Sequence, residues 1–286
     1  MGPSSEPWAE AHDLYVRAWV RSDPESVAVW RRYQESGYAD SSLLRAMVPG
    51  AGVAADNVGT AYWSTFQYQR LHADVMIRAL QTEGFTRRPP GAILVLDVGC
   101  GAGTAGFAVA ELLTSEPATV PLLYVGWDHN ATMRSLAATM LRHRGILPVG
   151  SQVQCLPTLR EAIGAAKELK PHAGCALVTF SYFFRQGAVT PSVARTVASD
   201  LGRLVDARAP VRVMVTDATG KRGSDSYPAF IGAARSRYFV ARESSGPIQY
   251  QLRYPYLYSH EGTFRTHNPP DPTAHYRYFW LRPLVL

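Results

Sequence analysis

The chain has 286 residues, of which 47% are hydrophobic, and carries a formal net charge of +6. That length fits one large α/β domain with an extension, and the apolar content suffices for a full core. No apolar run reaches the ~18 residues that a membrane-spanning helix needs, which excludes a helical membrane protein.

The charge and the cysteine content indicate which binding partners and which cellular compartment to expect. Nearly all of the positive charge is arginine scattered along the chain, a pattern that does not favour nucleic acid as the partner, although it leaves it possible. The three cysteines, Cys100, Cys155 and Cys175, show no CxxC spacing, so no disulfide framework and no metal site is predicted. The opening residues lack the basic and apolar regions of a secretory signal. These features predict a cytoplasmic protein with reduced thiols and no membrane association.

The first part of the chain is expected to form a helical cap. Residues 7 to 85 show helical periodicity and no strand signal. Helices are predicted from Pro7 to Val20, from Pro24 to Gln34 and from Asn57 to Thr82. A proline-containing linker follows, so the predicted division is a cap or lid over residues 1–88 and a catalytic domain over 89–286.

The longest cap helix carries an aromatic group. Tyr62, Trp63, Phe66 and Tyr68 are candidates for a lid that closes over a site. The spacing of the first three is also the spacing of a helical core, and both interpretations stay open.

An apolar strand then ends in an acid and breaks into a glycine-rich turn. Ala92 to Leu96 is continuously apolar, as in a parallel strand buried on both faces, and Asp97 follows. Gly99, Gly101 and Gly103 permit positive φ and let a ligand approach the backbone closely. A helix predicted from Thr104 to Leu113 would point its free N–H groups at whatever lies on the loop. The pattern predicts a nucleotide-cofactor loop.

The glycines alone do not identify the cofactor, because nicotinamide, flavin and S-adenosylmethionine proteins all use such a turn. Asp97 discriminates between them. A carboxylate two residues before the first glycine would repel an anionic pyrophosphate, whereas S-adenosylmethionine brings an ammonium group and a sulfonium. The segment from Ile93 to Thr104 therefore resembles motif I of the class I S-adenosylmethionine-dependent methyltransferases.

The resemblance implies an α/β fold of Rossmann-like type. Its mostly parallel seven-stranded sheet would end in a C-terminal antiparallel hairpin, and here the helical cap would be added at the N-terminal side. Leu122 to Asp128 is similar to the family's second strand, whose terminal acid accepts hydrogen bonds from the ribose hydroxyls. Asp128 is also a candidate N-cap for the helix predicted from Ala131 to Arg142. The cofactor-binding residues implied are Asp97, Gly99, Cys100, Gly101, Gly103, Asp128, His129, Leu156 and Phe180.

The rest of the chain alternates strand and helix, as a mostly parallel sheet requires. Strands are predicted over Gln152 to Cys155, Cys175 to Ser181 and Val211 to Thr216, and helices over Leu159 to Leu169, Pro191 to Asp206 and Tyr227 to Arg237. Ile248 to Tyr258 and Tyr276 to Leu281 are the two extended segments expected to form the final hairpin. One family feature is missing, because no acid follows the third strand to bind the adenine amino group.

Candidate catalytic residues come from two places. Tyr182 ends the fourth strand, where a ring would stack on a planar substrate or favour the sulfonium, with plain core packing as the alternative. His260, His267 and His275 are candidates for the general base that a hydroxyl acceptor requires. An amine acceptor would need alignment more than a base.

The resemblance implies an S-adenosylmethionine-dependent methyltransferase. We expect a small-molecule acceptor with a reactive oxygen or nitrogen, such as a biosynthetic metabolite. The sequence leaves three alternatives: an RNA or ribosome-associated methyltransferase, a non-catalytic module that keeps the cofactor fold, and a nicotinamide oxidoreductase, which Asp97 disfavours. It predicts no oligomeric state.

Overall fold

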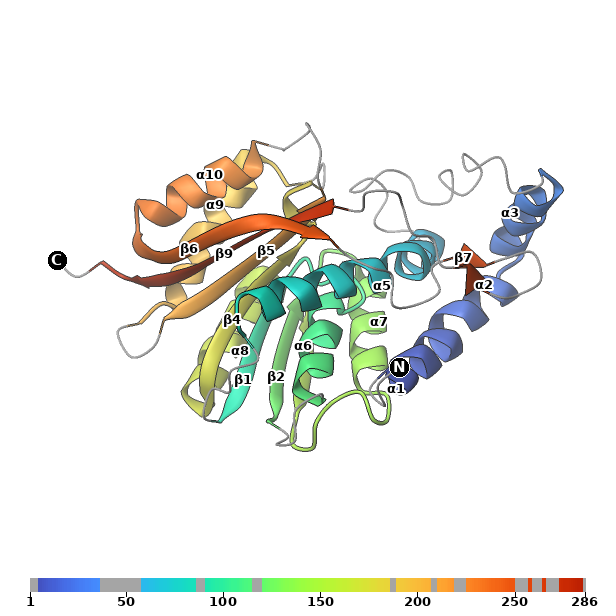
Figure 1. The fold of residues 1–286 in the computed structure, drawn as a ribbon, viewed down its shortest axis with the longest axis horizontal. Coiled ribbons are helices and arrows are strands. Elements are labelled where there is room, and N and C mark those ends of the chain that lie inside the picture. Colours follow the sequence, from blue (N-terminus) through green and yellow to red (C-terminus); the bar gives the residue numbers. More distant parts are fainter. Residues whose placement is uncertain are drawn as a thin grey trace.

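The computed structural model describes residues 5–36, 58–85, 91–114, 120–185, 189–206, 210–218, 225–249, 257–258, 264–265 and 273–284. A twisted sheet lies at the centre, helices cover both of its faces, and the N-terminal helices extend away from one side (Figure 1).

The first described helices follow the predicted pattern. The helix expected over residues 7–20 is a continuous run of α1 (Ser5–His12), a π-helical turn η1 (Asp13–Arg17) and α2 (Ala18–Ser22). Next come α3 (Pro24–Glu35) and α5 (Val58–Thr82). Asp23 caps the start of α3, since its Oδ2 accepts a hydrogen bond of 2.8 Å from the Ser26 amide.

The sheet has seven strands in the order β3-β2-β1-β4-β5-β9-β6. The first five are mutually parallel, and β9 runs antiparallel to both of its neighbours. The strands are β1 (Ala92–Val98), β2 (Leu122–Trp127), β3 (Gln152–Leu156), β4 (Ala173–Ser181), β5 (Val211–Ala218), β6 (Tyr238–Gln249) and β9 (Thr273–Pro283). A separate two-stranded pair, β7 (Leu257–Tyr258) and β8 (Phe264–Arg265), lies outside this sheet.

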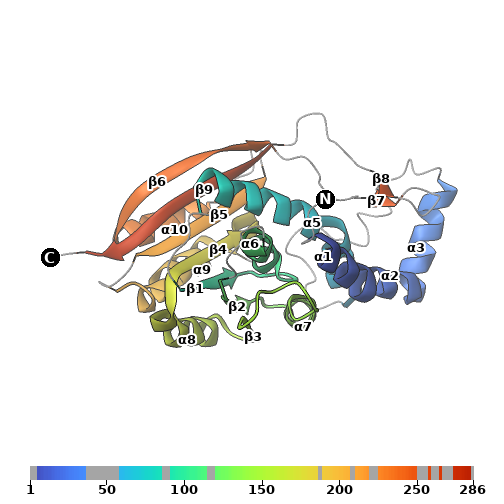
Figure 2. The same ribbon diagram turned by 60° about the horizontal axis from the view of Figure 1, so that its bottom comes forward.

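The connecting helices divide between the two faces. The helices along the chain are α6 (Thr104–Thr114), α7 (Ala131–Leu141), α8 (Leu159–Leu169), α9 (Pro191–Asp200) and α10 (Ser226–Arg235). In Figure 2, α8, α9 and α10 lie on one side of the sheet, and α5, α6 and α7 lie on the other. Strand side chains alternate between the two resulting cores, as the period of two in a strand requires.

The cap does not have a core of its own among the described residues. Trp8 of α1 and Trp63 of α5 belong to the same buried cluster as Phe107 of α6 and Tyr124 of β2. The division at residue 88 stays a prediction, because residues 86–90 lie outside the described part of the chain. None of the described helices is both long and apolar enough to cross a membrane.

The last part of the sheet corrects the sequence analysis. The partner of β9 is β6, which begins at Tyr238, ten residues before the predicted strand. A bulge hides the strand pattern, because Arg242 takes a φ of 51° and the register shifts between Ala241 and Ser244. The helix predicted to reach Asp206 is also shorter: α9 ends at Asp200 and passes into a 3-10 turn, η4 (Leu201–Arg203).

Candidate functional site

The glycine loop joins β1 to α6 at the carboxyl edge of the parallel strands, where ligands of open α/β sheets bind. Gly99, Gly101 and Gly103 have φ of 72°, 51° and 87°, so each has the left-handed backbone that favours glycine. The amides of Gly99 and Cys100 both donate to the Trp127 carbonyl, at 2.8 and 2.9 Å. The loop is thereby fixed to the end of β2.

Two of these glycines differ in what surrounds them. A Cβ on Gly99 would lie 2.6 Å from the Phe183 ring, which closes that side of the loop. A Cβ on Gly101 would meet nothing within 4 Å, so the backbone is open there. A nucleoside cofactor therefore has access to the main chain at Gly101, which fits the predicted cofactor loop.

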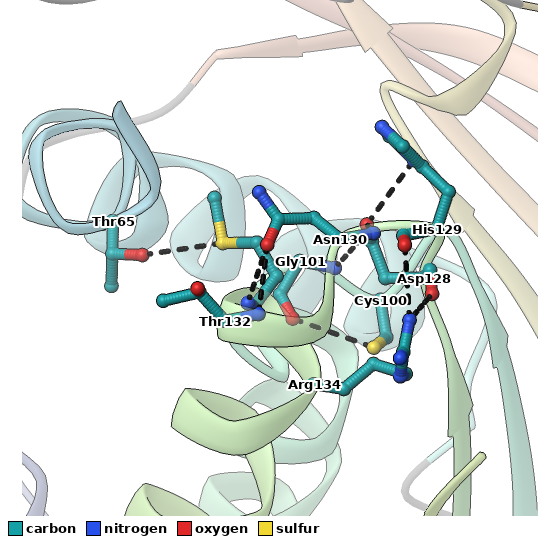
Figure 3. Close-up of polar contacts among 9 residues, drawn as sticks. Thr65, Cys100, Gly101, Asp128, His129, Asn130, Thr132 and Arg134 are labelled. Atoms are coloured by element: carbon teal, nitrogen blue, oxygen red, sulfur yellow. Dashed lines mark hydrogen bonds and ion pairs between the residues drawn. The ribbon is translucent and has the colours of Figure 1, made fainter. Parts of the chain in front are cut away.

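Asp128 lies directly after β2 and holds the loop from the other side (Figure 3). Its Oδ2 accepts a hydrogen bond of 2.9 Å from the Gly101 amide, and its Oδ1 accepts one of 2.9 Å from the Asn130 amide. The side chain is 5% exposed. Because each carboxylate oxygen has two lone pairs, these bonds leave acceptor capacity for a ribose hydroxyl. The ribose role of Asp128 stays a prediction.

The alternative role of Asp128 as a helix cap is wrong. Asn130 is the N-cap of α7, since its Oδ1 accepts from the amides of Thr132 and Met133 at 2.8 and 3.2 Å. Arg134, one turn into the helix, donates to the carbonyls of Asp128 and His129 at 2.6 and 3.0 Å. The turn after β2 is therefore fixed at both ends, and in Figure 3 it lies beside the glycine loop, to which Asp128 is bonded at Gly101.

His129 points its Nδ1 to within 3.3 Å of Asp128 Oδ1, and 43% of its side chain is exposed. Leu156, at the end of β3, is half-buried and pairs with Trp127 of β2. Both residues lie along the edge that carries the glycine loop. Their contacts with a cofactor stay predictions.

Asp97 lies beneath the loop and is fully buried. Its two oxygens accept hydrogen bonds from the hydroxyls of Tyr124 (2.9 Å) and Thr179 (2.8 Å). Burial raises the pKa of Asp97 to about 6, against the opposing effect of these hydrogen bonds. In this arrangement Asp97 joins β1 to β2 and β4 below the site, and its attraction for a ligand ammonium group stays a prediction.

The end of β4 holds a cluster of aromatic rings. Phe180, predicted to bind the cofactor, is fully buried and packs against Phe183, Phe184 and Phe230. The Phe180 side chain packs in the core, and this position does not support the predicted contact with the cofactor. Phe183 extends from the cluster to Gly99 and, edge-on, to Trp127, with ring centroids 6.3 Å apart.

Tyr182 leaves this cluster and turns toward the cap. Its φ of 56° is rare for a residue with a side chain, and such conformations concentrate at functional sites. Its amide donates to the Thr216 carbonyl at 2.9 Å. Its ring stacks on His72 of α5, which stacks in turn on Tyr68. The sequence analysis missed His72, although it follows Tyr68 by one helical turn on the same face.

His72 is half-buried, with its imidazole stacked against the Tyr182 ring. This burial lowers the pKa of His72 to about 3, so the ring is neutral at physiological pH. A neutral imidazole has one nitrogen that accepts and one that donates a hydrogen bond. His72 therefore brings both functions to the end of β4.

Helix α5 lies across the site. Thr65 Oγ1, which donates to the Ala61 carbonyl at 2.8 Å, lies 3.6 Å from Met133 Sδ at the start of α7. Gln69 Nε2 donates to the Ala102 carbonyl of the loop at 2.7 Å. His72 extends the same face to β4. The aromatic residues predicted as a lid do not all lie at the site. Trp63 and Phe66 are buried in the core, and Tyr62 stacks on Trp19. Tyr68 contacts the site through its stack on His72.

Of the three histidines predicted as candidate bases, His275 is the one that lies within the described residues. His275 is exposed on β9, paired with Asp217 of β5 and with Pro247 of β6. Since Asp217 is near the carboxyl end of β5, His275 lies on the edge of the sheet that carries the glycine loop. His260 and His267 fall outside the described residues.

No model of a protein family and no curated protein matches the sequence. Among solved structures, an O-methyltransferase family protein from Burkholderia thailandensis is similar at 15% identity and a TM-score of 0.41, covering 97% of this chain and 71% of that one. A SAM-dependent methyltransferase from Aquifex aeolicus is similar at 12% identity and a TM-score of 0.41, covering 79% and 98%. One from Leishmania major has 14% identity and a TM-score of 0.40, covering 83% and 89%.

These identities and TM-scores are too low to carry an argument about activity. The fold is identified instead from the strands themselves. Five parallel strands in the order β3-β2-β1-β4-β5 are followed by an antiparallel β9 and β6, the final hairpin that the motif resemblance implies. By the order and directions of its own seven strands, the chain has the Rossmann-like fold of the class I methyltransferases.

Proposed function

We propose that the protein is a methyltransferase that uses S-adenosylmethionine. The observation that carries the proposal is the glycine loop, which is open at Gly101 and hydrogen-bonded there to Asp128, the residue directly after β2. Its backbone would accommodate the methionine part of the cofactor, and Asp128 would accept hydrogen bonds from the ribose. When bound, the cofactor supplies a methyl group on a sulfonium, an electrophile that needs no activation by the protein.

The acceptor we propose is a small molecule with a reactive oxygen or nitrogen. Support comes from the aromatic stack of Tyr68, His72 and Tyr182 at the end of β4, because flat rings favour a planar ligand. We further propose that the enzyme acts in the cytoplasm on a biosynthetic metabolite.

The chain would contribute mainly alignment and exclusion of water. Helix α5 lies over the loop through Gln69 and over β4 through His72, so it covers the site from above. In-line attack on a sulfonium depends on such alignment. For a hydroxyl acceptor, a proton must also be removed, and the base we propose is His275, which pairs with Asp217 of β5.

Calorimetric titration with S-adenosylmethionine, S-adenosylhomocysteine and NADH, in parallel, tests the cofactor. The proposal predicts micromolar binding of the first two and none of NADH. Binding of NADH alone, or of none of the three, would overturn it.

The acceptor class is tested with S-adenosylmethionine that carries a tritiated methyl group. The purified protein is incubated with a cell extract, which is then separated into metabolite and RNA fractions. Label in the metabolite fraction supports a small-molecule acceptor. Label in the RNA fraction would replace it with an RNA acceptor, and cofactor binding without any transfer would indicate a non-catalytic module.

A further inference from the structure

Two cysteine side chains meet beside the glycine loop. Cys100 belongs to the loop, and Cys155 lies on β3, paired with Gly126 of the intervening strand β2. A Cβ built on Gly126 would lie 3.1 Å from the Cys100 sulfur. Paired residues of parallel strands present their side chains on the same face, so Cys155 lies next to the space that Gly126 leaves empty. Cys100 fills that space.

The two thiols differ in environment. Cys100 is buried, with 1% of its surface exposed, whereas Cys155 is only half-buried. The Cys100 Sγ donates a hydrogen bond of 3.4 Å to the Gly101 carbonyl. The neighbouring Cys155 thiol, followed by burial, raises the pKa of Cys100. The neighbouring Cys100 thiol, helped by the guanidinium groups of Arg142 and Arg134, lowers the pKa of Cys155 against the opposing effects of burial and Asp97. Because Cys155 is the more exposed of the two sulfurs, an oxidant from solvent reaches it first.

We propose that Cys100 and Cys155 are a redox-sensitive pair, which hydrogen peroxide converts to a disulfide that weakens cofactor binding. The second half of this inference rests on the proposed function. Cys175, the remaining cysteine, is buried on β4 beside β1 and takes no part.

The reaction consumes one peroxide for each disulfide. The Cys155 thiolate attacks one peroxide oxygen, the O–O bond breaks, and a sulfenic acid forms while the departing hydroxide takes a proton to become water. The Cys100 sulfur then attacks the Cys155 sulfur, the S–O bond breaks, and the thiol proton of Cys100 leaves with the hydroxide as a second water. Two thiols are oxidised and one peroxide is reduced.

A disulfide would change the loop because its S–S bond is short. Both thiols are free in this structure, and a disulfide brings its two sulfurs to ~2.05 Å, so bond formation pulls Cys100 toward β3. Cys100 stands between Gly99 and Gly101, whose amides bond to Trp127 and Asp128. On the other side, Cys155 precedes Leu156, a predicted cofactor contact. The bond would thus displace the loop at the point where it is open.

The test uses the full chain with and without hydrogen peroxide, and after re-reduction with dithiothreitol. Peptide mapping by mass spectrometry should find a Cys100–Cys155 cross-link, a mass lower by two hydrogen atoms, in the oxidised protein only. Calorimetry should show that the affinity for S-adenosylhomocysteine falls by about tenfold or more on oxidation and returns on reduction, an effect of about 1.4 kcal/mol.

Two variants complete the design. Cys155→Ala should form no cross-link and keep its affinity through peroxide treatment, whereas Cys175→Ala should behave as the wild type. A cross-link that involves Cys175, or peroxide oxidation of Cys155 to sulfinic acid without any cross-link, would overturn the proposal. So would a cross-link that leaves the affinity unchanged. If reduced wild-type protein binds no S-adenosylhomocysteine, the proposed function fails, while the cross-link itself is still decided by mass.

Discussion

The imidazole of His72 lies face to face with the phenol ring of Tyr182, with ring centroids 3.6 Å apart and 15° between the planes. The two residues are far apart in the sequence and come from the cap helix α5 and the end of β4. The stack therefore fixes how the cap lies against the sheet, and the left-handed backbone of Tyr182 is what aims its ring there. That strain has to be offset by the contacts it makes possible.

A double-mutant cycle measures this stack. We expect His72→Ala and Tyr182→Ala to interact by about 0.5–1.5 kcal/mol in the free energy of unfolding, determined by urea denaturation. Strictly additive effects would contradict a stack that stabilises the fold. Tyr182→Gly should be more stable than Tyr182→Ala by about 1–2 kcal/mol, because glycine adopts the left-handed conformation without penalty.

Gly99→Ala should damage the loop. The new Cβ would meet the Phe183 ring at 2.6 Å, and the backbone there has a φ of 72°. We expect a loss of about 1–3 kcal/mol in the free energy of unfolding, together with weaker binding of S-adenosylhomocysteine. The matched control is Gly164→Ala in α8, where a Cβ meets nothing within 4 Å. That change should stabilise the protein by about 0.5–1 kcal/mol. Equal effects of the two substitutions would be inconsistent with the loop geometry.

The buried carboxyl group of Asp97 should make stability depend on pH. The folded protein keeps the Asp97 proton up to about pH 6, whereas the unfolded chain releases it near pH 4. The folded state therefore binds more protons between these values, and stability falls as the pH rises through that window. Relative to Asp97→Asn, the free energy of unfolding of the wild-type protein should fall by about 3 kcal/mol between pH 4 and pH 7. Urea denaturation of both proteins across this range measures the difference, and a flat difference would rule out the raised pKa.

Asp128→Asn should weaken the affinity for S-adenosylhomocysteine by about tenfold or more, because hydrogen bonds to a charged group are worth ~1.5–3 kcal/mol. The substitution also replaces an acceptor of the Gly101 amide, so the loop itself should loosen. Asp206→Asn is the control, since Asp206 pairs with Lys170 just before β4, at the opposite edge of the sheet. Calorimetry of the two variants compares them directly. Similar affinities would remove Asp128 from the cofactor site.

The central part of the fold could be predicted because its signals are local. The run from β1 to α8 agrees with the expected elements to within a few residues. An apolar run defines each strand, and side-chain caps fix several helix starts. Thr158 and Glu161 illustrate this, since they form a reciprocal capping box at the start of α8.

The sequence predicted those parts of the site that depend on residue type and on position along the chain, and not those that depend on tertiary packing. The positive φ of the three glycines follows from residue type, and so does the place of Asp128 after β2. The contact of His72 with Tyr182 depends on how α5 crosses the sheet, which no local pattern encodes. Phe180 and Tyr182 would share one face if the strand continued, but the φ of Tyr182 separates them, so only one ring serves the core.

The placement of β9 between β5 and β6 has a consequence for biosynthesis of the protein. A chain that has been synthesised through β6 still lacks the strand to which both β5 and β6 bond. Until residues 273–283 leave the ribosome, β5 keeps one unpaired edge and β6 has no partner in the sheet. Exposed strand edges invite pairing with other chains, so the newly made protein is most prone to aggregate late in translation.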